Sequence, residues 1–410
     1  MTKDNLFGGT GPATRAIHLG YDPSTENGAL TPPIYLTSTY AFESAEDGVA
    51  TFAGERSGYV YGRSRNPTQA LLEARVADLE GGEAGLALAS GIAAITATVL
   101  SLVKAGDTVL VDQVIYGCSY SFFANHITRF GVEVIITDFT DLEALEAEFA
   151  KKPSLVFFET PSNPNMRIID IRGVAAMAKA AGAVCVVDNT FSSPIIQQPL
   201  ALGADIVVHS ATKFLGGHGD LLGGIVVGST DLIAGIRNAG LRMITGATLS
   251  PFNAFLILRG LKTLSLRMKA HCASALAVAT HMQAHPSVAA VHYPMLPGFA
   301  HRELAQSQMS GGGAIVSFQL VGGREMGMRF INALDLIKCA VSLGDAETLI
   351  QIPAGMTHAT YTCEERLRFG IPEDLVRLSV GLEDIEDLIL DIDRAFETVG
   401  SPLAKAGSSK

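Results

Sequence analysis

Residues 204–224, ADIVVHSATKFLGGHGDLLGG, constrain the fold of this chain more than any other segment. They begin with a short β-branched run, Ile206, Val207 and Val208, which is typical of a buried strand in a parallel sheet. Polar residues and then glycines follow directly, with Lys213 among them. Ligands of an open α/β sheet bind just beyond the carboxyl ends of its strands. The segment therefore predicts a doubly wound, mostly parallel sheet with Lys213 at its ligand-binding edge.

A second strand of the same kind precedes this segment and ends in an acid. Residues 184–187 form its apolar run, and Asp188 comes next, one strand-to-strand connection before Lys213. Because the carboxyl ends of parallel strands meet at one edge of a sheet, we expect the acid and the amine to lie close together.

Donors suited to a phosphate lie nearby in this arrangement. Ser210 and Thr212 supply hydroxyl groups, and Gly91 and Ile92 are expected to open a helix whose free N–H groups favour an anion. A lysine for a Schiff base, an acid for a pyridinium nitrogen and donors for a phosphate together predict pyridoxal phosphate (PLP) as the cofactor.

Length and charge narrow the class of protein. A chain of 410 residues exceeds one core, so a large domain and a smaller one are expected. The formal charge of -11, without a basic cluster, argues against nucleic acid as a partner. The histidines and cysteines lack the spacing of metal ligands, so no metal site is expected. The remaining partner is a small molecule.

Several features predict a cytoplasmic protein without a membrane span. The first residues, MTKDNLFGGTGP, contain no apolar signal core. Residues 85–103 are uncharged but carry serine, threonine and glycine, and we interpret them as a loop and a buried helix. The five cysteines are scattered, which is typical of reduced thiols.

The order of periodic segments predicts three parts. Residues 1–60 lack sustained periodicity and are expected to form an arm that contacts a neighbouring subunit. Residues 61–255 alternate helix and strand signals and form the predicted PLP-binding large domain. Residues 256–410 form the predicted small domain, after a long apolar stretch in which Gly260 is a possible kink. Its expected strands are 288–292, 314–320 and 376–380, and its expected helices are 326–334 and 385–396.

Several motifs together resemble one family. They are DIVVHSATKFLGGHG, ETPSNP, VVDNT, SGIAAI, YGRSRNPT, SLGDAETL, PAGMTH and VRLSVGLED, and they extend over nearly the whole chain. The chain is identified by them as similar to the cysteine and methionine metabolism family of PLP enzymes. Within that family the segment IYGCSY, residues 115–120, resembles the methionine γ-lyases.

The resemblance implies a PLP-dependent transferase of fold type I, similar to aspartate aminotransferase, with a small α+β C-terminal domain. It also implies a homotetramer of two catalytic dimers. Lys213 would hold PLP as an imine, Asp188 would keep the ring nitrogen protonated, and Tyr116 would stack on the ring. The implied phosphate ligands are Gly91, Ile92, Ser210 and Thr212, with Tyr61 and Arg63 from the neighbouring subunit. The implied substrate ligands are Asn163, Ser342 and Arg377, of which Arg377 binds the carboxylate.

The implied reaction is the α,γ-elimination of L-methionine to methanethiol, 2-oxobutanoate and ammonia. Lys213 can act as the general base if burial and a nearby positive charge lower its pKa. Tyr116 is the candidate acid for the leaving thiolate, with its pKa lowered if Arg63 lies close. Cys118 is either a specificity element near the thioether or a small buried apolar residue. Arg63 itself either contacts an anion or is solvated.

Two positions bear on the substrate. In methionine γ-lyases the segment similar to residues 240–246 carries a lysine and then an acid, whereas this chain has Arg242 and Met243. The missing acid weakens the preference for methionine if it supports the network around the cysteine. Cystathionine γ-lyases resemble one another in a glutamate where this chain has Val341, and an apolar valine suits a methyl thioether better.

Other functions stay open at this point. Cystathionine γ-lyase and O-acylhomoserine sulfhydrylase activities use the same scaffold. A nucleotide-binding protein is a different class, but the segment GGHGDLLGG matches neither GxGxxG nor GxxxxGK[ST]. A catalytically silent protein of the same fold is the last alternative.

Overall fold

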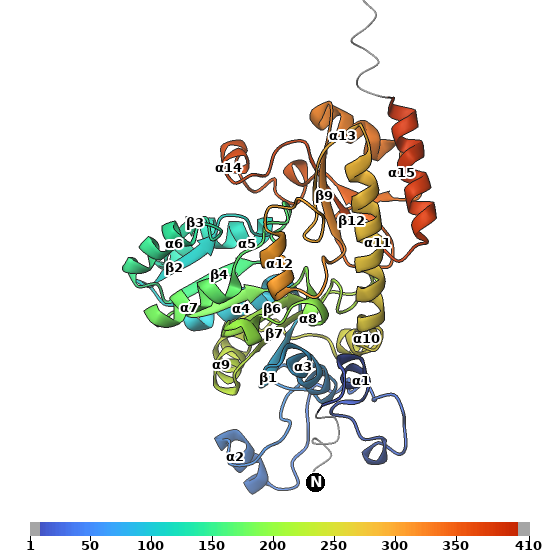
Figure 1. Ribbon diagram of the computed structural model, residues 1–410. Coiled ribbons are helices and arrows are strands. Elements are labelled where there is room, and N and C mark those ends of the chain that lie inside the picture. The colour runs from blue at the N-terminus through green and yellow to red at the C-terminus, as the bar shows by residue number, and fades with distance from the viewer. Residues whose placement is uncertain (1–8, 401–410) are drawn as a thin grey trace, which may run out of the picture.

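The computed structural model describes residues 9–400, and its larger part is built on a seven-stranded sheet (Figure 1). The strand order is β1-β7-β6-β5-β4-β2-β3. Strand β7 is antiparallel to both of its neighbours, and all other pairs are parallel. The strands are β1 Ala84–Leu88, β2 Thr108–Asp112, β3 Glu133–Thr137, β4 Leu155–Glu159, β5 Val184–Asp188, β6 Ile206–Ser210 and β7 Gly224–Gly228. The predicted mostly parallel sheet is confirmed.

Helices cover both faces of this sheet (Figure 1). Alternate residues of a strand point to opposite faces, so Ile225 of β7 packs in the core with Val76 of α3, while Val226 packs with Ile95 of α4. The sheet is therefore doubly wound, as predicted. The helices up to the end of the large sheet are α1 Pro12–His18, α2 Ala45–Ala53, α3 Pro67–Glu80, α4 Gly91–Leu102, α5 Gly117–Ser121, α6 Leu142–Glu148, α7 Ile171–Ala181, α8 Ser193–Ile196 and α9 Thr230–Ile236, with π-helical turns at Phe122–His126 and Arg237–Thr245.

The interpretation of residues 85–103 was right about the helix and wrong about the loop. Helix α4 begins at Gly91, but the residues before it form strand β1, which pairs with β7 in antiparallel register. The sequence AGLAL contains no β-branched residue, so propensity gives no strand signal there. Pairing and burial between two helical layers decide the conformation instead. No helix in residues 9–400 is long and apolar enough to cross a membrane.

The N-terminal segment contains more structure than its sequence predicts. Helices α1 and α2 form within it, and α2 is capped at both ends: the Ser44 hydroxyl accepts from Asp47 N, and Gly54 has φ 78°. Each helix is too short to give a periodic signal. Apolar side chains between them, such as Leu30 and Leu36, are 84% and 71% exposed. The arm over residues 1–60 stays a prediction, and residues 1–8, with most of the segment examined for a signal core, lie outside the described residues.

The C-terminal part is built on a five-stranded sheet of order β10-β11-β12-β9-β8. Its strands are β8 Val288–His292, β9 Ile315–Leu320, β10 Lys338–Cys339, β11 Leu349–Gln351 and β12 Leu375–Ser379, and its helices are α10 Pro251–Leu261, α11 Leu264–Ala284, α12 Arg302–Gln308, α13 Gly323–Asn332, α14 Cys363–Arg368 and α15 Ile385–Val399. The three predicted strands and two predicted helices are confirmed, whereas β10 and β11 are too short for a pattern. The predicted domain boundary after residue 255 falls inside α10 and stays a prediction.

Gly260 lies near the break between α10 and α11, but a kink is not its main role. A Cβ atom there would lie 2.4 Å from the carbonyl oxygen of Gly216 and 2.5 Å from that of Leu215. Such distances are too short for any side chain, so the helix can approach the segment after Lys213 only because residue 260 is glycine.

Candidate active site

One cavity of about 300 Å³ lies at the carboxyl ends of the strands of the large sheet, and the small sheet closes it from the other side. It brings Lys213 and Asp188 together, as the sequence predicts. The other predicted site residues that line it are Gly91, Ile92, Tyr116, Cys118, Asn163, Ser210, Thr212, Ser342 and Arg377. Tyr61 and Arg63 do not line it within one chain.

Lys213 lies in the turn after strand β6 and faces the small sheet. Its Nζ donates a hydrogen bond to Oγ of Ser342 at 2.8 Å. Burial and the charge of Arg377 together lower the pKa of Lys213 to about 8, although Asp345 opposes the shift. This is the direction that a general base requires.

Asp188 is the last residue of β5 and is 9% exposed. Its carboxylate accepts a hydrogen bond from Thr190 N at 2.9 Å. Burial raises the pKa of Asp188, while the hydroxyl and the N–H of Thr190 and the charge of His209 oppose the shift. A buried acid with few partners of its own can stabilise a cationic ring nitrogen.

The start of helix α4 and the end of β6 form a cradle for an anion. Ser90 caps the helix by accepting from Ala93 N, which leaves the N–H groups of Gly91 and Ile92 for a ligand. A Cβ atom on Gly91 would lie 2.7 Å from Cβ of Ser210, so only glycine leaves this space open. Together with the buried acid and the amine, this donor set fits a phosphorylated pyridine aldehyde.

Arg377 on β12 places a buried cation at the cavity wall, where it could bind a carboxylate. It is 2% exposed, and burial lowers its pKa to about 10. Nη1 donates to Oδ1 of Asn163 at 2.8 Å, and Nη2 donates to the carbonyl oxygen of Ser342 at 2.8 Å. Gln351, the neighbour of Arg377 across β11, places its amide against the same guanidinium. The side chain is therefore held rigidly at the cavity wall.

Tyr116 and Cys118 lie side by side at the start of helix α5. The thiol of Cys118 donates to Oη of Tyr116 at 3.4 Å. Cys118 is exposed, so its interpretation as a small buried residue is wrong. Burial and Cys118 raise the pKa of Tyr116 to about 12. The lowering expected from a nearby Arg63 does not occur within one chain, and the phenol keeps its proton.

Tyr61 and Arg63 lie on the surface, away from the cavity of their own chain. Nη1 of Arg63 donates to the carbonyl oxygen of Arg242 at 2.6 Å, and its guanidinium lies 5.9 Å from the centre of the Tyr61 ring. Met243, next to Arg242, is 71% exposed. These residues can act on a cofactor only in the cavity of another copy.

Glu159 lines the cavity, although the sequence analysis assigned it no role. It ends β4 directly beside Asp188 in the sheet register, and its Oε1 accepts from Asn163 N at 3.0 Å. Burial and Asp188 raise its pKa well above the usual range, while the N–H groups of Asn163 and Tyr116 oppose the shift. Its sequence signal, an acid that ends an apolar strand, is the same as that of Asp188.

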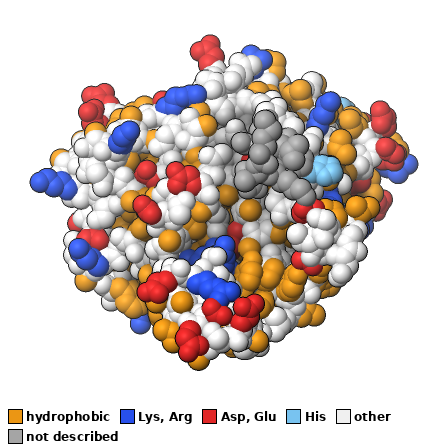
Figure 2. Space-filling view, turned by 90° about the horizontal axis from the view of Figure 1, so that it is seen from below, with side chains coloured by type: hydrophobic (Ala, Val, Ile, Leu, Met, Phe, Trp, Pro, Cys, Tyr) orange, Lys and Arg blue, Asp and Glu red, His pale blue; other side chains and the backbone are white. Residues whose placement is uncertain are grey.

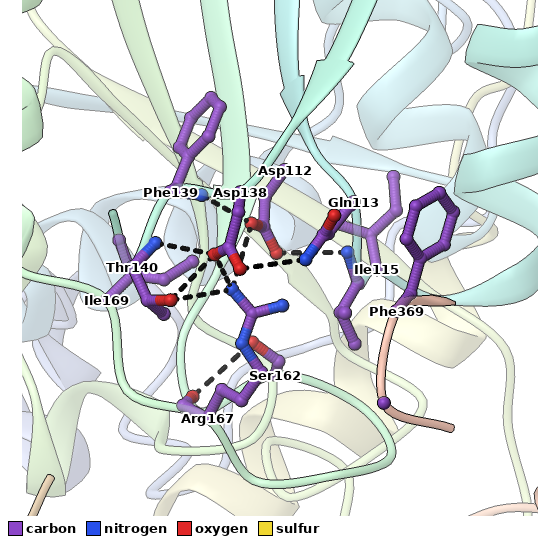
Figure 3. Close-up of polar contacts among 12 residues, drawn as sticks. Asp112, Gln113, Ile115, Asp138, Phe139, Thr140, Ser162, Arg167, Ile169 and Phe369 are labelled. Atoms are coloured by element: carbon purple, nitrogen blue, oxygen red, sulfur yellow. Dashed lines mark hydrogen bonds and ion pairs between the residues drawn. The ribbon is translucent and has the colours of Figure 1, made fainter. Parts of the chain in front are cut away.

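A cluster of charged side chains, of which Asp112 is buried, fixes the loops that carry the predicted tyrosine and asparagine (Figure 3). Arg167 forms an ion pair with Asp138, and its Nη2 lies 3.6 Å from Oδ1 of Asp112. Asp112 accepts from Val114 N at 3.1 Å, and the carbonyl oxygen of Arg167 accepts from Ser162 N at 2.9 Å. The loops after β2 and β4 are therefore tied together outside the cavity.

Comparisons with known proteins agree on one family. A model described as Cys/Met metabolism PLP-dependent enzyme matches residues 13–397. An L-methionine gamma-lyase of Pseudomonas putida is 54% identical over 387 residues, 94% of this chain and 97% of that protein. An O-succinylhomoserine sulfhydrylase of Pseudomonas aeruginosa is 44% identical over 383 residues, 93% of this chain and 94% of that protein.

The solved structures agree with this result. Cystathionine gamma synthase from Xanthomonas oryzae pv. oryzae, in complex with aminoacrylate and cysteine, is 40% identical to this chain. The match covers 95% of this chain and 98% of that one, with a TM-score of 0.90. The two chains therefore share one fold along almost their entire length.

Proposed function

Because the chain belongs to the Cys/Met metabolism family of PLP-dependent enzymes, we propose that it catalyses the α,γ-elimination of L-methionine to methanethiol, 2-oxobutanoate and ammonia. Membership of this family confirms the resemblance, the fold type I architecture and the cofactor that the sequence predicts. The alternative of a nucleotide-binding protein is wrong. The name of the Pseudomonas putida relative supports methionine as the substrate.

The observation that carries this proposal is the apolar rim of the cavity. Val341 and Leu222 line the cavity and remain 56% and 62% exposed. A distal ammonium group, such as that of cystathionine, needs a charged or polar partner when it is desolvated. A methyl thioether needs none. The rim therefore favours methionine over cystathionine.

The side chains at the cavity wall bind and orient the amino acid. Arg377 presents paired N–H donors that match a carboxylate, and Asn163 holds the guanidinium in place. Since Arg377 is buried, water competes weakly for this contact. The substrate is thereby held in one orientation.

The remaining residues move and hold protons. When bound, PLP supplies the electron sink for the bonds that break at the α and β carbons. Lys213, with a pKa of about 8, is partly unprotonated near neutral pH and accepts a proton at Nζ. Asp188 would stabilise the charge on the pyridine nitrogen. Tyr116, with a pKa of about 12, retains a phenolic proton that it can donate from Oη to the leaving thiolate.

Product analysis tests the proposed reaction. Purified enzyme with PLP and L-methionine alone should release methanethiol, ammonia and 2-oxobutanoate in equal amounts. Parallel assays use cystathionine, and an acylhomoserine with sulfide. No turnover of methionine together with rapid turnover of either alternative would reject methionine γ-lyase activity and select the competing function.

A charge at the cavity rim tests the role of Val341. Val341→Glu is expected to lower kcat/KM for methionine about 10-fold and to raise that for cystathionine, because a carboxylate suits an ammonium group but not a methyl thioether. Steady-state kinetics with both substrates measures the change. Val341→Ile is the control and should keep the preference for methionine. An unchanged ratio in Val341→Glu would show that the rim does not select the substrate.

We also propose that the chain assembles as a homotetramer of two catalytic dimers. The N-terminal segment supports this assembly, because Leu30, Leu36, Val49 and Phe52 are exposed on it. Figure 2, which views the molecule from the side of this segment, shows hydrophobic side chains gathered on that face. Within such a dimer, Tyr61 and Arg63 would reach the phosphate cradle of the neighbouring copy.

Cofactor retention tests the contact across the dimer. Arg63→Ala should weaken PLP binding about 10- to 100-fold, since a charge-assisted contact contributes roughly 1.5–3 kcal/mol. The measurement is the amount of PLP that stays on the protein after dilution and gel filtration. Arg65→Ala is the matched control from the same segment, because its guanidinium lies over Tyr59. Equal retention in both variants would contradict the shared site.

We also propose that the protein resides in the cytoplasm. All five cysteines are free in the structure, and three of them, Cys118, Cys339 and Cys363, are exposed. Exposed thiols persist in a reducing environment, so the structure supports such a compartment. The thiol content of freshly purified protein under native conditions is the direct measurement.

A further inference from the structure

The loop that brings Ser342 to the cavity also carries an acid that lies behind it. Asp345 is 7% exposed and does not line the cavity. One of its carboxylate oxygens, Oδ1, is buried without a hydrogen-bond partner among the described residues. A buried carboxylate oxygen without a hydrogen-bond partner destabilises the folded state, so a role is needed that explains the position of Asp345.

The loop around Asp345 contacts the segment after Lys213 at three successive points. Nζ of Lys213 donates to Oγ of Ser342 at 2.8 Å. A Cβ atom on Gly344 would lie 2.8 Å from Phe214 N, and one on Gly219 would lie 3.3 Å from Cγ of Asp345. The two loops therefore lie against each other along their length. A side chain at 345 has a fixed position relative to the amine.

We propose that Asp345 is a positioning residue for Lys213: it holds the Ser342 hydroxyl that accepts from Nζ, and its charge stabilises the proton on the lysine nitrogen. This inference rests on the proposed function, because it concerns the same lysine. Asp345 itself would contact neither the substrate nor the cofactor.

The electrostatics of the loop agree with the geometry. Burial raises the pKa of Asp345, whereas the charge of Lys213, the Ser342 hydroxyl and the Gly219 N–H oppose this shift and favour the carboxylate. In return, Asp345 is the group that raises the pKa of Lys213 against burial and against Arg377 of β12. Glu347, further along the loop, opposes the charge of Asp345. Neutralising Asp345 should therefore release the proton of Lys213 at lower pH.

The test uses the substrate-free holoenzyme, so it does not depend on which amino acid is cleaved. The visible absorbance of the lysine-linked cofactor is titrated with pH in the wild type, in Asp345→Asn and in Glu347→Gln. Asp345→Asn should move the midpoint down by about 1 pH unit, because a nearby negative charge is lost. Glu347→Gln removes an exposed charge that does not face Lys213, and its midpoint should not move.

Kinetics and a second variant complete the experiment. In Asp345→Asn, kcat should fall about 10-fold with KM nearly unchanged, since the lysine and not the carboxylate site is disturbed. Asp345→Ser keeps an oxygen for the Ser342 hydroxyl but no charge, and should shift the midpoint in the same direction. A midpoint that stays at the wild-type value in either folded variant, or that moves equally in Glu347→Gln, would overturn the inference. Failure to cleave methionine would leave this titration valid.

Discussion

Lys213→Ala is expected to lower kcat with methionine by at least about 10³-fold, the largest effect of any single change in this chain. The variant loses both the amine that binds the cofactor and the base that moves the protons. Because Ser342 accepts the one hydrogen bond that this side chain makes among the described residues, the fold should be retained. Steady-state and single-turnover assays measure the loss, and borohydride should no longer fix the cofactor to the protein.

A surface lysine provides the control for this experiment. Lys269→Ala changes an exposed residue of α11 and should keep full activity and borohydride labelling. Peptide mapping of the wild type should find the reduced adduct on Lys213. An adduct on another lysine, or a Lys213→Ala variant with more than a tenth of the wild-type kcat, would show that the amine has been misassigned.

Asp188→Asn is expected to lower kcat about 10²- to 10³-fold, because the amide cannot stabilise a positive charge on the ring nitrogen. The free energy of unfolding should not fall with kcat in this variant. Burial raises the pKa of Asp188 above its unfolded value, so this group binds more protons in the folded state and costs stability as the pH rises past its ordinary pKa near 3.9. At neutral pH the uncharged isostere should leave the apoprotein at least as stable.

Activity is therefore measured on the holoenzyme and thermal unfolding on the apoprotein made from the same preparation, both at pH 7. Asp220→Asn, which changes an exposed acid in the glycine-rich segment after Lys213, is the control and should alter neither value. A folded Asp188→Asn variant with kcat within about 3-fold of the wild type would mean that the acid does not serve the ring. A large loss of stability would mean that its charge is structural.

The core of the site follows from local sequence because its residues end strands. Asp188 comes directly after an apolar strand run, Lys213 lies in the turn after another, and parallel pairing brings these strand ends together. Glu159 carries the same signal, and counting strand-terminal acids would have found it. Gly91 and Ser210 were predicted from the same edge. The local sequence pattern is therefore sufficient to predict residues of the cavity wall that the large sheet forms.

The opposite wall could not be derived from local pattern. Arg377 and Ser342 come from a different sheet, far along the chain, and no periodicity says which loop of one sheet meets which edge of another. The resemblance to a family supplied both residues. The role proposed for Asp345 has no sequence signal because it depends on the contact between Ser342 and Lys213, which are far apart in the chain.

Some elements differ from prediction because packing overrides propensity. Strand β1 contains only alanine, glycine and leucine, and it is a strand because β7 pairs with it. Helices α1 and α2 are too short to give a periodic signal; Pro12 begins the first, and the caps Ser44 and Gly54 delimit the second. These conformations depend on contacts that a periodic sequence pattern does not reveal.

The cavity is completed by groups from the sides of two sheets, the amine beside the large sheet and the guanidinium on the small one. A molecule that contacts Lys213 and Arg377 at once therefore links these two parts of the structure. Its binding free energy adds to the free energy of unfolding. The unfolding temperature should therefore rise with the fraction of protein that holds the ligand. At ligand concentrations too low to fill the cavity, the protein should be easier to unfold and degrade.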